Sequence, residues 1–168
     1  MQKDGHYLGS HSDKHLLYCD WGKRDSLLVT KEEFTGDLAD SYAEMKKYGI
    51  NKTDAPYFLP PYEWFNDSIS AWTRQLGLQL INFTPGTRSH ADYTYPGPDN
   101  YQNSTVIYQS ILDYITSHPA GLNGFILLVH IGTDPRRTDK FYHRLPALIA
   151  FLKEKNYSFQ TVKGLLHK

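Results

Sequence analysis

Apolar residues recur along this chain at two different spacings, one helical and one typical of strands. Between residues 31 and 48, apolar side chains three and four positions apart form one stripe, as in an amphipathic helix. Thr30 and Glu33 have the spacing of a capping box, and Gly49 follows as a helix stop. We expect three more helices: one between the N-cap Asn66 and Gly77, one over residues 104–117, and a last one that Asp139 can cap.

Short apolar runs lie between the predicted helices. The run Phe125–Val129 is almost continuously apolar, which is typical of a parallel strand buried on both faces. Strands that alternate with helices of this length favour an α/β fold with a parallel sheet or a barrel. The predicted strands are the run that leads to His11 and the segments 56–59, 78–83, 124–130 and 158–162.

Unusual residues follow four of these predicted strands. In parallel α/β folds the chemistry lies at the carboxyl ends of the strands, so we expect these residues on one face. The stretch 84–103 is long, polar and rich in Gly and Pro, and a loop of that length in a compact domain is usually functional or disordered. The residues concerned are His11 and His15, Pro60-Pro61-Tyr62, Thr84-Pro85-Gly86-Thr87 and His130.

The bulk properties exclude several classes of function. A length of 168 residues suits a single domain over 1–168, and a net charge of zero gives no reason to expect nucleic-acid binding. The sequence has no apolar run long enough for membrane insertion and no apolar core of a signal peptide at its start. A single cysteine excludes an intrachain disulfide framework, and we expect Cys19 to be a structural thiol.

His11 and His15 are four residues apart, a spacing that one helical turn brings to the same side of the backbone. Neutral imidazoles are common metal ligands, so this pair could supply two corners of a tetrahedral Zn²⁺ site. The segment Asp134–Arg137 is expected to be a solvated loop. The other histidines lack a partner pattern and are expected to be ordinary surface or packing residues: His6, His90, His118, His143 and His167.

Four segments resemble motifs of the NodB-type polysaccharide deacetylases of carbohydrate esterase family 4. They are Gly5 to His15, Phe58-Leu59-Pro60-Pro61-Tyr62, Leu127 to His130, and the ending from Leu145 to Val162. The resemblance implies that His11 and His15 bind the metal and that the Tyr62 backbone N–H helps to stabilise an oxyanion. It also implies that His130 is the general acid, oriented by Asp92.

The chain also departs from the family pattern. The family's Thr-Phe-Asp-Asp motif, which supplies the general base and the third metal ligand, has no counterpart before Gly5. Leu59 stands where the family has an arginine, and Asp92-Tyr93 stands for its Asp-Trp pair. A complete barrel needs about 250 residues, so we expect an incomplete (β/α) barrel, lacking the first strands and truncated at the N-terminus.

The resemblance implies a metal-dependent hydrolase that removes acetyl groups from an N-acetylated or O-acetylated glycan. The divalent metal would be zinc, with cobalt and nickel as alternatives, and the substrate class implies an extracytoplasmic location. An alternative is an inactive glycan-binding or interaction module built on the same fold. An open sheet edge would need an upstream segment to cover it, or would lead to self-association.

Overall fold

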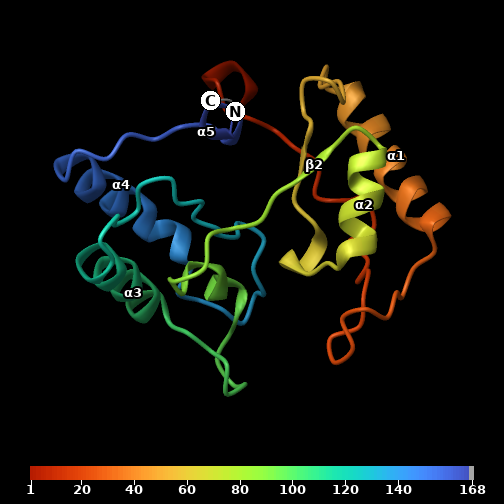
Figure 1. Ribbon diagram of the computed structural model, residues 1–168. Coiled ribbons are helices and arrows are strands. Elements are labelled where there is room, and N and C mark those ends of the chain that lie inside the picture. The colour runs from red at the N-terminus through yellow and green to blue at the C-terminus, as the bar shows by residue number, and fades with distance from the viewer. Residues whose placement is uncertain (167–168) are drawn as a thin grey trace. The chain divides into compact units, whose positions relative to one another are not determined.

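The computed structural model describes residues 1–166 and divides them into two compact units. The N-terminal unit comprises Met1–Asn82 together with the C-terminal segment from Thr161, and the C-terminal unit comprises Phe83–Gln160 (Figure 1). Each unit has its own cluster of buried apolar side chains. The prediction of a single domain over 1–168 stays a prediction.

A small parallel sheet lies at the centre of the N-terminal unit. Strand β1 (Tyr57–Phe58) pairs with β2 (Gln79–Leu80), and Ser10 forms a parallel bridge with Phe58 on the other side of β1. A Cβ atom on Gly9 would lie 2.9 Å from the Tyr57 carbonyl oxygen, so the close approach of these segments requires glycine. The run before His11 and the two strands therefore point in one direction, as the sequence predicts.

Helix α1 (Lys31–Lys47) begins at the predicted capping box. The Thr30 hydroxyl accepts from the Glu33 backbone N–H at 3.1 Å, and the Glu33 carboxylate accepts from the Thr30 N–H at 2.7 Å. Helix α2 (Asp67–Gln75) begins at Asn66, as predicted. Both helices contribute to the core around β1, where the rings of Phe34 and Trp72 are 5.8 Å apart.

Three short helices complete the N-terminal unit: η1 (Gln2–Asp4), η2 (Pro61–Glu63) and α5 (Val162–Leu166). The predicted strand 158–162 is wrong, because the described chain forms no strand there and α5 begins at Val162. No helix within residues 1–166 combines the length and the apolar character needed to span a bilayer.

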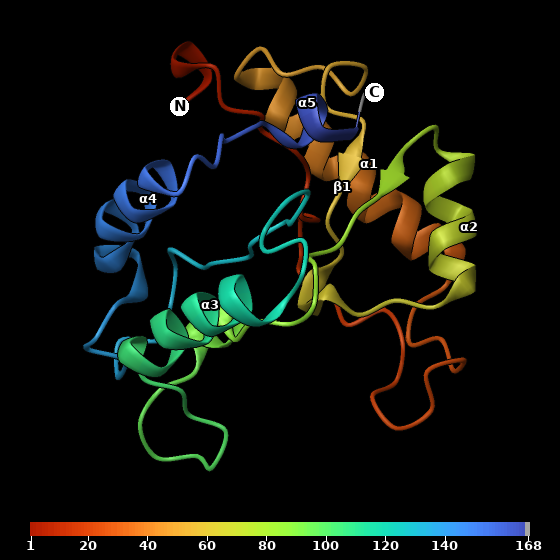
Figure 2. The ribbon, with the colours of Figure 1, turned by 60° about the vertical axis from the view of Figure 1, so that its left-hand side comes forward.

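Helices dominate the C-terminal unit (Figure 2). Its core is the contact between α3 (Ser104–Ser117) and α4 (Leu145–Glu154), with η4 (Phe141–Arg144) leading into α4. The short helix η3 (Ser89–Tyr93) lies within the long loop 84–103. The buried apolar residues in the core of the C-terminal unit are Ile107, Ile111, Phe141, Leu148 and Leu152.

Two predictions fail in the C-terminal unit. Residues 124–130 form no strand in the described structure; they are half-buried, and Thr84 donates a single backbone hydrogen bond to Ile126. An apolar run forms a strand only where a neighbour supplies a hydrogen-bond ladder. Asp139 does not cap α4, because its carboxylate accepts from the Ser104 N–H at 2.7 Å, at the start of α3.

The segment Asp134–Arg137 is only partly the solvated loop that the sequence predicts. Arg136 is exposed, but the Arg137 side chain is fully buried. The Arg137 guanidinium donates to the carbonyl oxygens of Thr94 and Gln102, at 2.7 and 2.9 Å. Arg137 is buried because it supplies hydrogen bonds that the long loop would otherwise leave unsatisfied.

The capping box gives a direct test of the local structure. Replacing Thr30→Ala removes the side-chain acceptor for the Glu33 N–H and should lower the free energy of unfolding by about 1 kcal/mol. Urea denaturation measures this change. The control Thr53→Ala, at an exposed turn position, should change stability by less than about 0.5 kcal/mol; equal effects of the two substitutions would contradict the assignment.

Candidate functional site

The loop from His11 to His15 is not a helical turn, so that part of the prediction is wrong. Ser12 and His15 have φ angles of 76° and 54°, in the left-handed region. The hydroxyl of Ser10 accepts from the Ser12 N–H at 3.2 Å, and the hydroxyl of Ser12 accepts from the His15 N–H at 2.8 Å. Serine side chains are the acceptors in this turn, in place of the backbone carbonyls that would accept in a helix.

A buried carboxylate on α1 holds this loop. Asp37 is 1% exposed and accepts from the backbone N–H groups of Lys14 and Asp13, at 2.8 and 3.4 Å. The Tyr18 hydroxyl donates to the same carboxylate at 3.2 Å, and burial raises the pKa of Tyr18 well above its usual value. Sequence analysis missed Asp37, although an acidic residue on the apolar stripe of an amphipathic helix is a detectable signal.

The turn brings the two predicted metal ligands together. The ring centres of His11 and His15 are 5.0 Å apart, and His11 Nδ1 lies 2.8 Å from the Leu59 carbonyl oxygen. A carbonyl oxygen only accepts hydrogen bonds, so Nδ1 of His11 carries a proton and Nε2 of a neutral ring presents its lone pair. Two imidazoles that share one tetrahedral zinc have ring centres roughly 5 Å apart. The pair therefore fits two positions around such an ion.

A third ligand is not found beside this pair. Within residues 1–166, no group of three or more His, Cys, Asp or Glu side chains is placed to hold a metal. The Leu59 side chain, at the position of the family's arginine, offers no polar group. What Leu59 contributes instead is its carbonyl oxygen, which orients His11.

Tyr62 lies next to the imidazole pair. It belongs to η2, which follows β1 directly, and its ring centre is 4.6 Å from that of His15. Tyr62 and Glu63 have φ angles of 59° and 53°, a conformation that costs non-glycine residues about 1–3 kcal/mol each. Strained residues of this kind cluster at functional sites, which favours a functional role for this turn.

The C-terminal unit contains a second polar arrangement that the sequence predicts, the pair of His130 and Asp92. The His130 backbone N–H donates to Asp92 Oδ2 at 2.7 Å, and His130 Nδ1 lies 2.6 Å from Asp92 Oδ1. The Asp92 carboxylate is 1% exposed, whereas the His130 side chain is 28% exposed. The buried carboxylate fixes the orientation of the ring.

His90 packs against Phe83, which agrees with the packing role that we expected. Its ring stacks on Phe83 with centres 4.7 Å apart, and its buried Nδ1 has no hydrogen-bond partner among the described residues. Burial, and then the nearby His130, lower the pKa of His90 below its usual value. His90 therefore stays neutral near the His130–Asp92 pair. The sequence offers no signal for this role beyond its spacing of two residues from Asp92.

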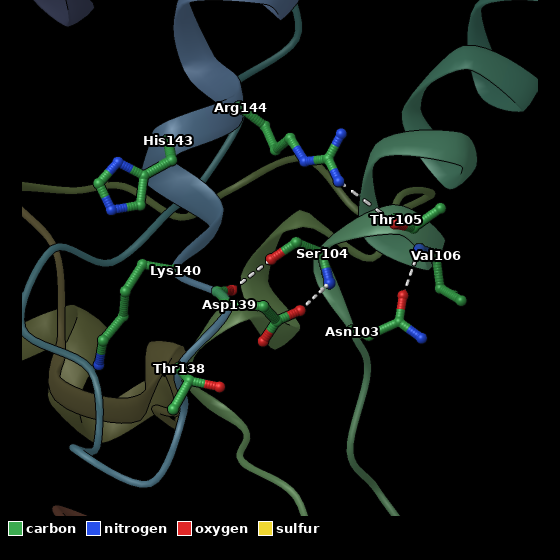
Figure 3. A pocket seen from close by; sticks show the side chains of 9 residues that line it. All are labelled: Asn103, Ser104, Thr105, Val106, Thr138, Asp139, Lys140, His143 and Arg144. Atoms are coloured by element: carbon green, nitrogen blue, oxygen red, sulfur yellow. Dashed lines mark hydrogen bonds between the residues drawn. The ribbon is translucent and has the colours of Figure 1, made fainter.

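The other polar residues have ordinary environments. Cys19 is fully buried and burial raises the pKa of its thiol, in keeping with a structural role. His6, His118 and His143 are exposed, and His167 lies outside the described residues. An open depression of about 450 Å³ lies at the start of α3, between Asn103 and Arg144 (Figure 3). None of the predicted site residues lines this depression.

The role of Asp37 is testable through metal affinity. Replacing Asp37→Ala leaves the N–H groups of residues 13 and 14 without their acceptor, so the turn should loosen and zinc affinity should fall about 10–100-fold. Competition with a chromophoric chelator measures the zinc affinity. The control Asp40→Ala removes an exposed carboxylate from the same helix and should leave zinc affinity unchanged. An unchanged affinity in Asp37→Ala would show that the turn does not depend on this carboxylate.

The lowered pKa of His90 predicts a pH dependence of stability. The unfolded chain binds a proton on this ring more readily than the folded chain does, so folding stability is lost as the pH falls through about 6.5. Urea denaturation at pH 5 and pH 7.5 should show a smaller loss for His90→Gln than for the parent. The exposed control His6→Gln should behave like the parent; a His90→Gln variant with the parental loss would refute this origin.

Sequence comparison identifies relatives of the N-terminal half. Residues 1–81 match the polysaccharide deacetylase family. Over 81 residues the chain is 33% identical to chitin deacetylase 2 of Saccharomyces cerevisiae. This match covers 48% of this chain and 23% of that protein. The family match spans both imidazoles and the Pro-Pro-Tyr turn.

Structural comparison extends the likeness to almost the whole chain. A carbohydrate esterase family 4 pseudoenzyme from Bacillus anthracis is 19% identical, with a TM-score of 0.68, and the match covers 98% of this chain and 48% of that one. A mutant of that protein with restored enzymatic activity gives a TM-score of 0.69 and covers 49% of its own chain. The chain thus spans about half the length of these structures. Residues 1–81 are thus similar in sequence to the polysaccharide deacetylases, and nearly the whole chain resembles a carbohydrate esterase family 4 structure in fold.

Proposed function

We propose that this chain is part of a metal-dependent hydrolase that removes acetyl groups from a polysaccharide. The observation that carries the proposal is the pair of His11 and His15, with ring centres 5.0 Å apart and with His11 oriented by the Leu59 carbonyl. Such an orientation serves a ligand better than a core residue, because it leaves Nε2 as the reactive atom of a neutral His11 ring. The match of residues 1–81 to the deacetylase family supports it.

His11 and His15 would hold the metal, most suitably zinc, with cobalt or nickel as alternatives. A bound divalent cation would supply Lewis acidity for the acetyl carbonyl and for the attacking water. The protein's part is to keep Nε2 of His11 aimed outward while Nδ1 donates to Leu59, and to keep the His15 ring near it through the Ser12 hydrogen bond. The exposed position of His15 suits a catalytic site, which must admit a substrate.

The proposal gives His130 the role of general acid. With Nδ1 bound to the buried Asp92, the ring can carry a proton on Nε2 and give it to the leaving amine or alcohol. Asp92 would orient the ring and stabilise its charge, as the carboxylate does in catalytic triads. The Tyr62 backbone N–H would donate to the oxyanion that develops on the acetyl carbonyl.

The general base and the third metal ligand would come from residues that are not grouped with this pair in the described chain. The β1–β2 pair and the parallel bridge at Ser10 are compatible with an incomplete (β/α) barrel. A segment from elsewhere in the protein, or a second copy, would then supply the carboxylates along the open edge of β2 or of the run before His11. The substrate, an acetylated glycan, would place the protein outside the cytoplasm.

A second candidate is a glycan-binding or interaction module without catalytic activity. One observation favours it: only two of the three expected ligands are grouped among residues 1–166. Under this proposal the two imidazoles and the Tyr62 turn would be retained for fold and for binding. The two candidates differ in whether zinc is bound and in whether acetate is released.

Zinc binding and acetate release from N-acetylated chito-oligosaccharides together test the proposal. Replacing His11→Ala should weaken zinc affinity at least tenfold and abolish acetate release, because one ligand of the pair is lost. The control is His6→Ala, an exposed histidine of the same segment, which should change neither quantity.

Two results would decide against the deacetylase. Acetate release by His11→Ala at the parental rate would show that the imidazole pair is not needed. Zinc binding by the parent without acetate release, even after addition of a peptide or protein segment with the Thr-Phe-Asp-Asp motif, would favour the non-catalytic module.

A further inference from the structure

Three aromatic side chains lie in a row beside the imidazole pair. The rings of Trp21 and Tyr62 have centres 5.7 Å apart, and those of Trp21 and Trp64 are 5.4 Å apart at an angle of 32°. Tyr62 also contacts His15, so the row continues to the candidate metal ligands. All four residues belong to the N-terminal unit. We refer to Trp21, Tyr62 and Trp64 as the aromatic row.

Two loops form this row. Trp21 lies near the tip of a turn closed by the antiparallel bridge between Cys19 and Leu27, in the loop that extends away from α1 and α2 in Figure 1. Asp20 Oδ1 accepts from the N–H groups of Gly22 and Lys23, at 2.8 and 2.7 Å, which fixes the turn. Tyr62 and Trp64 come from the strained segment after β1.

Hydrogen bonds hold the two loops against each other. The Trp64 indole N–H donates to the Asp20 carbonyl at 3.3 Å, and the Asn66 amide donates to the Arg24 carbonyl at 3.0 Å. The Arg24 guanidinium lies 4.3 Å from the centre of the Trp64 ring and so covers this ring. The aromatic row is therefore a fixed arrangement, with its most exposed ring at Trp21.

Packing of the core does not explain the aromatic row. Trp21 is 57% exposed and Tyr62 is 46% exposed, and neither these two nor Trp64 belongs to the apolar core of the N-terminal unit. The exposure of these rings leaves unused the stabilisation that burial of a large apolar side chain gives. Exposed apolar surface that is held in a fixed shape marks a binding site.

We propose that the aromatic row is a subsite that binds a pyranose ring of a β-linked N-acetylhexosamine chain by stacking on Trp21. Such a ring has flat C–H faces that fit an indole, and hydroxyl groups around its edge that need polar partners. Lys23, Arg24 and Asp25 are exposed next to Trp21 and can supply these partners. The identity of the sugar rests on the proposed deacetylase function.

The polar surroundings favour a sugar over an apolar protein partner. The centre of a protein interface carries few charges, whereas this row is bordered by the charged residues Lys23, Arg24 and Asp25. The contact from Trp21 through Tyr62 to His15 also gives the bound chain a direction. A sugar ring on Trp21 would place a neighbouring residue of the same chain toward the imidazoles, where an acetyl group could react.

Titration of the full chain with N-acetylated chitohexaose, followed by calorimetry, tests this subsite. Trp21→Ala should weaken binding at least tenfold, and Trp21→Phe, which keeps a smaller ring, should weaken it less. The control Tyr48→Ala removes an exposed aromatic residue at the end of α1 and should leave the affinity unchanged. Because Trp21 is exposed, both of its variants should melt at the parental temperature; if Trp21→Ala unfolds, Trp21→Phe carries the test.

Parallel measurements separate failure of the subsite from failure of the enzyme. If the parent binds chitohexaose through Trp21 but releases no acetate, the subsite stands and the deacetylase proposal fails. If the parent releases acetate and Trp21→Ala has the parental KM, the deacetylase stands and the subsite is refuted. Absence of chitohexaose binding by the parent, or an unchanged affinity in Trp21→Ala, also overturns the subsite.

Discussion

The hydrogen bonds of one buried carboxylate determine the shape of the candidate metal site. Asp37 projects from α1 into the loop between the two imidazoles, where it accepts from two successive backbone N–H groups. Without this acceptor the loop would lose the two hydrogen bonds that attach its backbone to α1. The capping box at the start of α1 and the apolar stripe that follows it position this carboxylate, so helix formation and site geometry are linked.

The Leu59 carbonyl adds a second constraint. It accepts a hydrogen bond from His11 Nδ1–H, which leaves Nε2 as the nitrogen of the neutral ring with a free lone pair. The same short segment continues into the strained Tyr62 turn and then to Trp64. Three features of the site therefore follow β1 directly: the Leu59 carbonyl, the Tyr62 turn and the Trp64 ring. A polar backbone atom performs this orientation, so it does not depend on the side chain at position 59.

The sequence predicts the helices of this chain better than its strands. Helices α1, α2 and α3 begin at the expected residues because Thr30, Asn66 and Asn103 satisfy the first N–H groups locally. Strand formation depends on a partner distant in sequence, so the apolar content of residues 124–130 could not establish a strand. Within the site, the pair His11–His15 follows from motif spacing, and the pair Asp92–His130 is expected only from the family resemblance. Asp37, Arg137 and the serine-based turn do not, because their roles arise from contacts between distant segments.

The central claim is that His11 and His15 bind one metal ion through the nitrogen left available by the Leu59 hydrogen bond. Long-range ¹H–¹⁵N NMR of the imidazole nitrogens during a zinc titration measures this directly. The account predicts that Nε2 of His11 and one nitrogen of His15 shift together at one equivalent of zinc, while Nδ1 of His11 keeps its proton. Unchanged signals of both rings in the presence of excess zinc would contradict the account.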